Sequence, residues 1–296
     1  MVRASLWVLG GLGLRELLAR VWEAADRDEV IDRAGALSYS FLFSFFPLLL
    51  FVAALVSLLP VHHVIRQLMD SGARLLPGEA ERAVRDTLRQ VIAGRGHRGL
   101  ISLGALTALW AGSTGLATVM SMLNVVYRVR DARPWWQRRA IAVLLTVVFA
   151  AFLVAATLLV MLSARLQPAS GPAGGVLTSV VPVVLTLIAV DLVYFVAPAG
   201  RRAWHWLTPG AVTFTALWLV LSFGLRLYVD HFGHYDVMYG AIGGLIVFLL
   251  WLFLTSVVLL VGAEVNCVIA AAAASPALVT PGASSPPLAP PARRSA

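Results

Sequence analysis

Asp191 is the ionisable residue that lies well inside an apolar stretch of this sequence, residues 176–197. An aspartate at mid-membrane costs about 2.5–3.5 kcal/mol, so its side chain should face protein or water, or carry a proton. One interpretation is therefore a proton or cation site on a transport path. The alternative, which the pattern favours, is a hydrogen-bonded structural residue that reaches toward the inner membrane face, in a helix that Pro182 is expected to bend.

Two charged residues near the end of another apolar stretch, Arg226 and Asp230, are four positions apart and so lie on one helical face. They could form an ion pair that lines an internal cavity. We favour an ion pair at the outer membrane interface, because the long arginine side chain can extend its charge toward water.

A carboxylate and an amide, Glu264 and Asn266, directly follow the long uncharged run 237–263. They should face water, headgroups or a partner, and we expect them at the cytoplasmic end of the protein, level with Asn124. We interpret Glu264 as an interfacial anchor that pairs with the arginines of residues 128–139. The sharper hypothesis is an inner gate formed by Glu264 and those arginines.

The segment 230–236 is rich in side chains that can bind metals, with His231 and His234 three positions apart beside aspartates. Two histidines and a carboxylate can hold zinc. No H-E-x-x-H motif or similar frame accompanies them, so we favour a solvated outer turn. We expect no metal site and no other cofactor.

Small and hydroxyl-bearing residues recur on two apolar stretches, at Ser40 and Ser44 on one and at Ser113 and Thr114 on the other. Small residues let membrane helices approach closely, and hydroxyl groups form hydrogen bonds between them. Close packing is the interpretation that we favour. The functional alternative is a polar groove between the first two membrane helices.

The sequence contains no G-x-S-x-G, Walker A or H-E-x-x-H motif. A nuclease would need clustered carboxylates that hold metal on an aqueous face. The predicted cytoplasmic loops offer arginines and tryptophans but few acids. We therefore expect no enzymatic activity.

The elements that position these residues must lie in a membrane, because 59% of the chain is hydrophobic and only 13% is charged. A soluble domain has about 25% charged residues. The net charge of +8 comes from 23 arginines without a lysine. We expect these arginines to contact anionic lipid headgroups rather than nucleic acid. The single cysteine, Cys267, excludes an intrachain disulfide.

Apolar stretches between charged residues predict an all-α bundle of six transmembrane helices, near residues 36–59, 100–122, 141–164, 176–197, 207–229 and 240–263. Arginines concentrate before the first, after the second and after the fourth of these helices, which places both termini in the cytoplasm. The loop after the first helix disagrees, because it carries seven arginines on the predicted outer side. We give it less weight because it is long and also carries acids.

Further segments complete the predicted organisation. Residues 1–33 form a cytoplasmic N-terminus, in which apolar positions at helical spacing over 14–22 predict an amphipathic helix, either in the inner interface or packed on the bundle. Residues 60–99 are expected to form an amphipathic helical outer loop. The membrane domain spans 34–270, and the proline-rich residues 271–296 are expected to be a disordered cytoplasmic tail.

Five sequence blocks carry a family resemblance: AGALSYSFLFSFFPLLL, LWAGSTGLATVMSMLNVVYRV, PWWQRRAIAVLLT, VYFVAPAGRRAWHWLTPGA and YGAIGGLIVFLLWLFLTSVVLLVGAEVN. In their order and spacing they resemble the YihY/BrkB family. The resemblance covers about residues 20–268 and implies a six-helix protein of the bacterial inner membrane with cytoplasmic termini. Members of the family have been called virulence factor BrkB or ribonuclease BN, and nothing in this sequence supports a nuclease.

The resemblance also identifies recurrent positions of the family in this chain. They are Pro47, Trp110, Asn124, Tyr127, Pro198, Pro209, Gly210, Tyr239, Gly240, Trp251, Gly262, Glu264 and Asn266. Asp191, His231 and His234 do not belong to that pattern, which weakens any claim that they carry a function shared by the family.

Two hypotheses describe the function. The first is a transporter or flippase for an amphiphilic or lipid-like substrate, working through a polar groove in the bundle. The alternative is a scaffold or envelope-integrity protein that transports nothing and satisfies its intramembrane polar groups by packing. A polar cavity open to one side or to the lipid would favour the first hypothesis, and a sealed bundle would contradict it. The sequence leaves the oligomeric state open.

Overall fold

The computed structural model describes residues 11–57, 98–170, 172–200, 207–232 and 235–274. Within these ranges the chain forms seven α-helices and no strand, which confirms the predicted all-α class. The helices are α1 (Leu14–Arg27), α2 (Val30–Ser57), α5 (Arg98–Val126), α6 (Trp135–Ser170), α7 (Pro172–Val196), α8 (Pro209–Phe232) and α9 (Tyr235–Ala274).

Five of these helices contain stretches long and apolar enough to cross a membrane, which confirms a polytopic membrane protein. The stretches are Val30–Val52 in α2, Gly104–Val126 in α5, Trp135–Leu159 in α6, Pro209–Val229 in α8 and Gly243–Ala274 in α9. In α7 the described apolar stretch is shorter, Val180–Val196, and it falls within the predicted fourth span. The predicted outer loop and most of the predicted tail lie outside the described residues.

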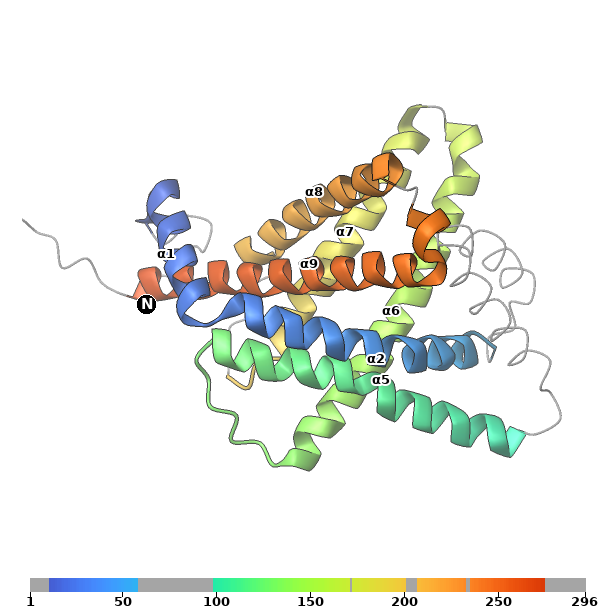
Figure 1. Cartoon of the computed structure of the whole chain (residues 1–296), viewed down its shortest axis with the longest axis horizontal. Coiled ribbons are helices and arrows are strands. Elements are labelled where there is room, and N and C mark those ends of the chain that lie inside the picture. Colours follow the sequence, from blue (N-terminus) through green and yellow to red (C-terminus); the bar gives the residue numbers. More distant parts are fainter. Residues whose placement is uncertain (1–10, 58–97, 171, 201–206, 233–234, 275–296) are drawn as a thin grey trace, which may run out of the picture.

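The helices form a bundle in which α2 packs against both α5 and α9 (Figure 1). The other strong contacts join neighbours in the chain, α6 with α7 and α8 with α9. The starts of α2 and α8 lie at the same end of the bundle as the last parts of α5, α7 and α9 (Figure 1). We call this the junction end.

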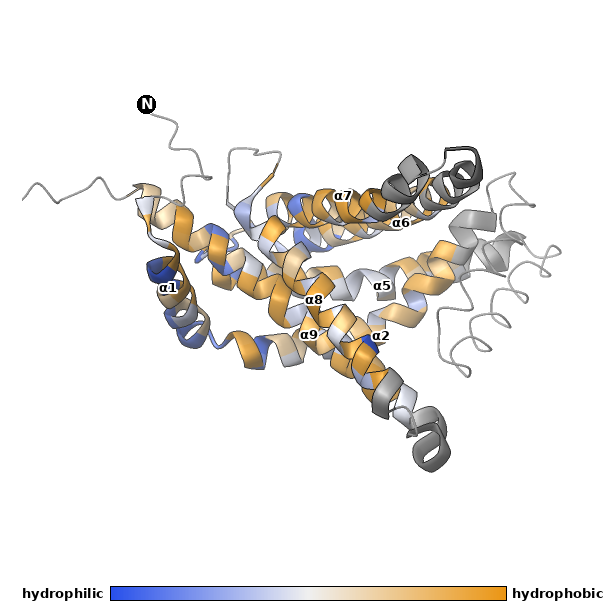
Figure 2. Ribbon diagram, turned by 90° about the horizontal axis from the view of Figure 1, so that it is seen from above, coloured by the Kyte–Doolittle hydropathy of each residue, from blue (hydrophilic) through white to orange (hydrophobic). Residues whose placement is uncertain are grey.

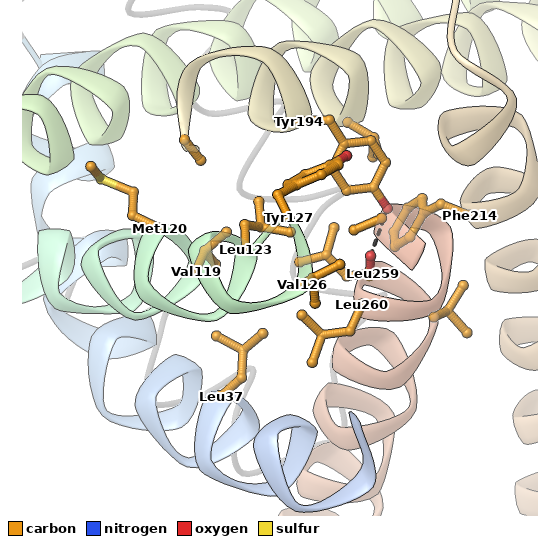
Figure 3. Close-up of a cluster of buried hydrophobic side chains, with 14 of the residues drawn as sticks. Leu37, Val119, Met120, Leu123, Val126, Tyr127, Tyr194, Phe214, Leu259 and Leu260 are labelled. Atoms are coloured by element: carbon orange, nitrogen blue, oxygen red, sulfur yellow. Dashed lines mark hydrogen bonds between the residues drawn. The ribbon is translucent and has the colours of Figure 1, made fainter. Parts of the chain in front are cut away.

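The buried core forms where α2, α5 and α9 meet. Leu37, Leu123 and Leu260 are completely buried and belong to one cluster of apolar side chains, shown in Figure 3. In a bilayer, van der Waals packing holds such a cluster together. The hydrophobic effect does not, because the surrounding lipid is as apolar as leucine. Phe223 and Ile246, by contrast, are exposed on the bundle surface, as expected for helices surrounded by lipid.

Helix α1 lies across the junction end as a hydrophilic element beside the apolar helices (Figure 2). One face buries Leu17 and Val21 against Val265 and Ile269 of α9. The adjoining side of the same apolar stripe exposes large side chains, namely Leu14, Leu18 and Trp22. The packing contact and the exposed apolar side therefore coexist on one helix. Placement of that exposed side in the membrane interface stays a prediction.

Candidate functional site

Asn266 lies at the centre of the polar contacts at the junction end. The backbone N–H of Gly210, in the first turn of α8, donates to its side-chain oxygen at 2.7 Å. The Asn266 amide group donates to the hydroxyls of Thr208 at 3.2 Å and Tyr127 at 3.4 Å. One buried side chain of α9 thus joins α5 to the start of α8, so Asn266 is a structural link rather than a group that faces water.

This link requires α8 and α9 to approach closely at a pair of glycines. A Cβ atom added at Gly210 would collide with the carbonyl oxygen of Gly262, and it would lie 2.5 Å from Nδ2 of Asn266. A Cβ atom added at Gly262 would lie 2.5 Å from the hydroxyl of Tyr194. Small residues at helix contacts let membrane helices pack at this distance.

Asp191 is buried and holds the connection between α7 and α8. Its Oδ1 accepts hydrogen bonds from the backbone N–H of Thr208 at 3.1 Å and from the Thr208 hydroxyl at 2.5 Å. The same hydroxyl accepts a bond from the N–H of Ala211, so Thr208 caps the start of α8. These contacts support the structural interpretation of Asp191, because its charge is matched by donors on a neighbouring turn.

Asn124 is a second link at the junction end. Its side-chain oxygen accepts a hydrogen bond from the N–H of Ala199 at 2.7 Å, and its amide donates to Asp131 at 3.2 Å. Asp131 in turn binds the Arg133 guanidinium at 2.9 Å. The end of α5 is thereby tied both to the segment after α7 and to the loop before α6.

Asp131 remains ionised in this setting. Burial alone would raise the pKa of Asp131, but hydrogen bonds from Arg133 and the charges of Arg133 and Arg138 outweigh burial, so this pKa lies below its ordinary value of 3.8. The loop between α5 and α6 therefore carries a carboxylate that is matched by two arginines.

The four residues of the predicted polar groove lie along the contact of α2 with α5. Ser40 accepts a hydrogen bond from Thr118 at 3.1 Å, and Ser113 donates to a carbonyl of its own helix. Ser44 is buried against the backbone of Gly115. Thr114 accepts a weak bond from Arg139 at 3.5 Å. Only the Ser40 and Ser44 contacts join α2 to α5, and they support close packing there. The hydroxyl of Ser44 is buried without a hydrogen-bond partner.

The predicted residues near the other end of the bundle are only partly described. Arg226 is exposed on α8, whereas the side chains of Asp230, His231 and His234 lie outside the described residues. The ion pair and the solvated turn therefore stay predictions. In the part of the chain that the structure describes, no three His, Cys, Asp or Glu side chains come together in a way that could hold a metal ion.

A groove of about 370 Å³ lies between α5 and α6. Its lining is almost wholly apolar, with one charged group, and consists of Leu106, Leu109, Trp110, Trp135, Trp136, Arg139, Ala140 and Val143. All three tryptophans are more than half exposed. The groove therefore opens on the lateral surface of the bundle and not into its interior.

The Arg139 side chain is the charged group of this groove. Its guanidinium carbon lies 4.2 Å from the centre of the Trp110 ring, a cation–π contact. The same guanidinium donates to the carbonyl of Trp110, while its Nε is buried and has no hydrogen-bond partner. Arg139 is thus fixed in orientation, with its guanidinium over the Trp110 ring.

Glu264 does not form the expected pair with the arginines after the second membrane helix. It is completely buried, and neither of its carboxylate oxygens has a hydrogen-bond partner. Its carboxyl group instead lies within hydrogen-bonding reach of the carboxyl group of Asp28, in the turn between α1 and α2. Among the described residues no arginine forms a hydrogen bond with Glu264, so the expected anchor through the arginines of residues 128–139 is not seen.

Sequence reasoning missed Asp28 and placed Arg139 only among the arginines of residues 128–139, without a groove. Asp28 belongs to a segment of mixed charges, 26–33, in which nothing local distinguishes one acid from the next. Arg139 follows Trp135 and Trp136 by about one helical turn, and tryptophans beside an arginine are typical of a membrane interface. That local signal was sufficient to identify Arg139, whereas Asp28 requires the fold.

Comparison with known proteins identifies the relatives of this chain. The family model of the virulence factor BrkB matches residues 21–283. The Bacillus subtilis (strain 168) ribonuclease-like protein YfkH is 30% identical over 257 residues, which cover 80% of this chain and 89% of that protein.

Other relatives carry the description of membrane proteins. The UPF0761 membrane protein RSc1559 of Ralstonia nicotianae is 28% identical, over 85% of this chain but only 58% of its own length. A UPF0761 membrane protein of Tolumonas auensis is also 28% identical, over 84% of both chains. No solved structure matches the chain.

Proposed function

The chain belongs to the virulence factor BrkB family of membrane proteins, and we propose that it binds amphiphiles with an anionic headgroup and carries them across the membrane. The observation behind this proposal is the groove between α5 and α6, which combines an apolar lining with the Arg139 guanidinium. This groove takes the place of the polar one expected between α2 and α5, where the two helices pack closely around Gly112 and Gly115.

The lining of the groove suits the two halves of an amphiphile. Leu106, Leu109 and Val143 offer an apolar wall to a hydrocarbon chain. Arg139 offers N–H donors in a planar arrangement that fits phosphate or carboxylate oxygens. The volume of the groove falls within the range of about 300–1,000 Å³ that is typical of ligand sites.

The exposed tryptophans suit the same ligand. Trp135 and Trp136 begin α6 and are 72% and 57% exposed. Tryptophan concentrates at the level of lipid headgroups because its ring is apolar and its N–H is polar. A lipid that enters the groove from the side would therefore meet aromatic rings beside its headgroup, and its chain would stay in the apolar part.

We infer further that the junction end faces the cytoplasm of a bacterial inner membrane. α1 packs on the last part of α9, so the first and last described helices meet at this end. The loop between α5 and α6 at the same end carries Arg128, Arg130 and Arg133. Cytoplasmic loops are enriched in such residues, which attract anionic headgroups.

The second candidate function, a scaffold that transports nothing, is favoured by the satisfied polar groups at the junction end. Asn124, Asp191 and Asn266 are all hydrogen-bonded, as packing alone would require. We prefer transport because the Arg139 guanidinium lies beside exposed tryptophans in a groove that opens on the lateral surface of the bundle. We also propose that the chain is not an enzyme, although the Bacillus relative is named ribonuclease-like.

Reconstitution tests this function directly. The full chain is placed in vesicles that contain phosphatidylglycerol with a fluorescent group, and an impermeant reductant bleaches the outer leaflet. We expect the protein to expose lipid of the inner leaflet to the reductant. Arg139→Gln should slow this by about tenfold, since a charge-assisted hydrogen bond contributes about 1.5–3 kcal/mol.

The matched control is Arg130→Gln, which removes the same charge from an exposed position in the loop before α6. It should transport at the wild-type rate. Transport equal to that of protein-free vesicles would contradict the proposal and favour the scaffold. Equal slowing by both variants would show that net charge, and not the groove, matters.

A further inference from the structure

We propose that Glu264 and Asp28 form a proton-binding site that fastens the α1–α2 turn to α9 when one proton is bound between them. The two carboxyl groups come from distant parts of the chain and meet at the junction end. The site shares no residue with the groove between α5 and α6, so the proposal does not rest on the proposed transport activity.

The first observation is the isolation of Glu264. Its side chain is 0% exposed, and neither carboxylate oxygen finds a donor in the protein. Every other buried acid or amide named above accepts at least one hydrogen bond. Burial disfavours a carboxylate that lacks donors, and a bound proton relieves that cost.

The second observation is the position of Asp28. It ends α1, its side chain is 12% exposed, and its Oδ2 has no hydrogen-bond partner. The next residue, Glu29, has a positive φ of 49°, so the turn is tight and directs Asp28 inward. The backbone carbonyl of Asp28 accepts a bond from Arg33 at 2.7 Å, which fixes this turn.

The charges around the pair are unequally distributed. Arg27 and Arg128 each place a guanidinium nitrogen 3.7 Å from a carboxylate oxygen of Asp28. Arg33 contacts the carbonyl of Asp28 and the carboxylate of Glu29. Of these cations only Arg27 influences Glu264 as well, and it does so without forming a salt bridge. The described cations therefore lie beside Asp28, whereas Glu264 has no arginine within hydrogen-bonding distance.

One proton removes the unfavourable contact between the two acids. Protonated Glu264 can donate an O–H···O⁻ hydrogen bond to Asp28, and this charge-assisted type is among the strongest in proteins. Two neighbouring carboxylates repel each other, and a proton held between them removes that repulsion. Removal of the proton leaves two negative charges in contact, with arginines beside only Asp28.

A metal cation is a poorer fit to this position than a proton. Calcium takes about 6–8 oxygen ligands and magnesium about six. The described residues supply two carboxyl groups here, and no third acid, histidine or cysteine joins them. The two arginines beside Asp28 would also repel a divalent cation.

The consequence of proton binding is mechanical. Leu17 and Val21 of α1 rest on Val265 and Ile269, which flank Glu264 on α9. Repulsion between Glu264 and Asp28 would therefore push the α1–α2 turn away from the surface that holds α1. We expect α1 to be closed on α9 when the proton is bound and to separate from it when the proton leaves.

The experiment measures the proton and the helix separately, on the full chain in lipid nanodiscs. Infrared difference spectra should show the carbonyl band of a protonated carboxyl group, lost as the pH is raised. Hydrogen exchange should show protected amides in α1 that lose protection over the same pH range. In Glu264→Gln the band should be absent, and α1 should stay protected at every pH, because the glutamine amide donates to Asp28 permanently.

Asp28→Asn provides a second variant in case Glu264→Gln does not fold, and it should likewise remove the pH dependence of α1 protection. The control is Glu16→Gln, an exposed acid of α1 that pairs with Arg20, which should behave as wild type. A wild-type band that survives in Glu264→Gln would overturn the proposal. So would α1 protection that is independent of pH, or protection that follows added Ca²⁺ or Mg²⁺ at constant pH.

Discussion

The two deeply placed acids of the junction end, Asp191 beside the α7–α8 connection and Glu264 beside the α1–α2 turn, meet opposite surroundings. Asp191 accepts bonds from both the backbone and the hydroxyl of Thr208. Glu264 accepts none and faces another carboxyl group. Both acids are almost completely buried. Asp191 has hydrogen-bond donors and stabilises a connection, whereas Glu264 lacks donors and is the acid that we propose to exchange a proton.

The largest expected effect is at Gly210, in the first turn of α8, where the backbone contacts Gly262 and Asn266 of α9. Gly210→Ala should destabilise the protein by about 3 kcal/mol, because its Cβ would collide with the backbone of α9 and force α8 outward. Thermal unfolding in detergent measures the loss.

Gly224→Ala is the matched control on the same helix, since a Cβ atom there meets nothing within 4 Å. It should leave the protein as stable as wild type or raise its stability by about 0.5 kcal/mol. Equal effects of the two substitutions would show that α8 and α9 are not in close contact at Gly210.

The sharpest test of the comparison replaces each acid by its amide. Asp191→Asn should destabilise the protein by about 2 kcal/mol at pH 7, because it removes a charged acceptor of two hydrogen bonds. Glu264→Gln should be neutral or stabilising at the same pH, since it adds a donor beside Asp28. The difference in unfolding temperature between the two variants is the measurement, and destabilisation of the same size in both would remove the distinction.

The smallest expected effect concerns Asp131, a carboxylate matched by arginines. Its pKa is lowered in the folded protein, so its contribution to stability is present above the ordinary value of 3.8 and is lost as the pH falls through the folded value. Asp131→Asn should therefore flatten the loss of thermal stability between about pH 5 and pH 3. The direction is opposite to that of Glu264, whose contact is expected to weaken as the pH rises. An unchanged slope in Asp131→Asn would contradict this assignment.

Part of the candidate site was predictable from local sequence. The run 237–263 identified a membrane helix, and the polar residues behind it were expected at its end. Asn124 and Asn266 were expected at one level, and the fold brings both to the junction end, where they bind different partners. The small residues of α2 and α5 were best interpreted as packing groups, in agreement with their contacts.

The remaining roles depend on contacts between distant residues. Asp191 stood out in the sequence because an acid in an apolar helix is costly, yet Thr208 satisfies it across the connection that follows. Glu264 was assigned to the arginines near residues 128–139, but the α1–α2 turn occupies the position beside it. Arg128 reaches Asp28 instead, so the expected charge pair exists with a different acid.

The sequence by itself determined that this protein is a helical membrane protein, because hydropathy is a local property and about 20 apolar residues are sufficient to span a bilayer. It also determined that polar groups would gather at the helix ends. Only the tertiary structure decided which of those groups are satisfied. Hydrogen-bond donors reach a buried acid from other helices, and the pairing of Glu264 with Asp28 joins the two ends of the chain in a contact that no local pattern records.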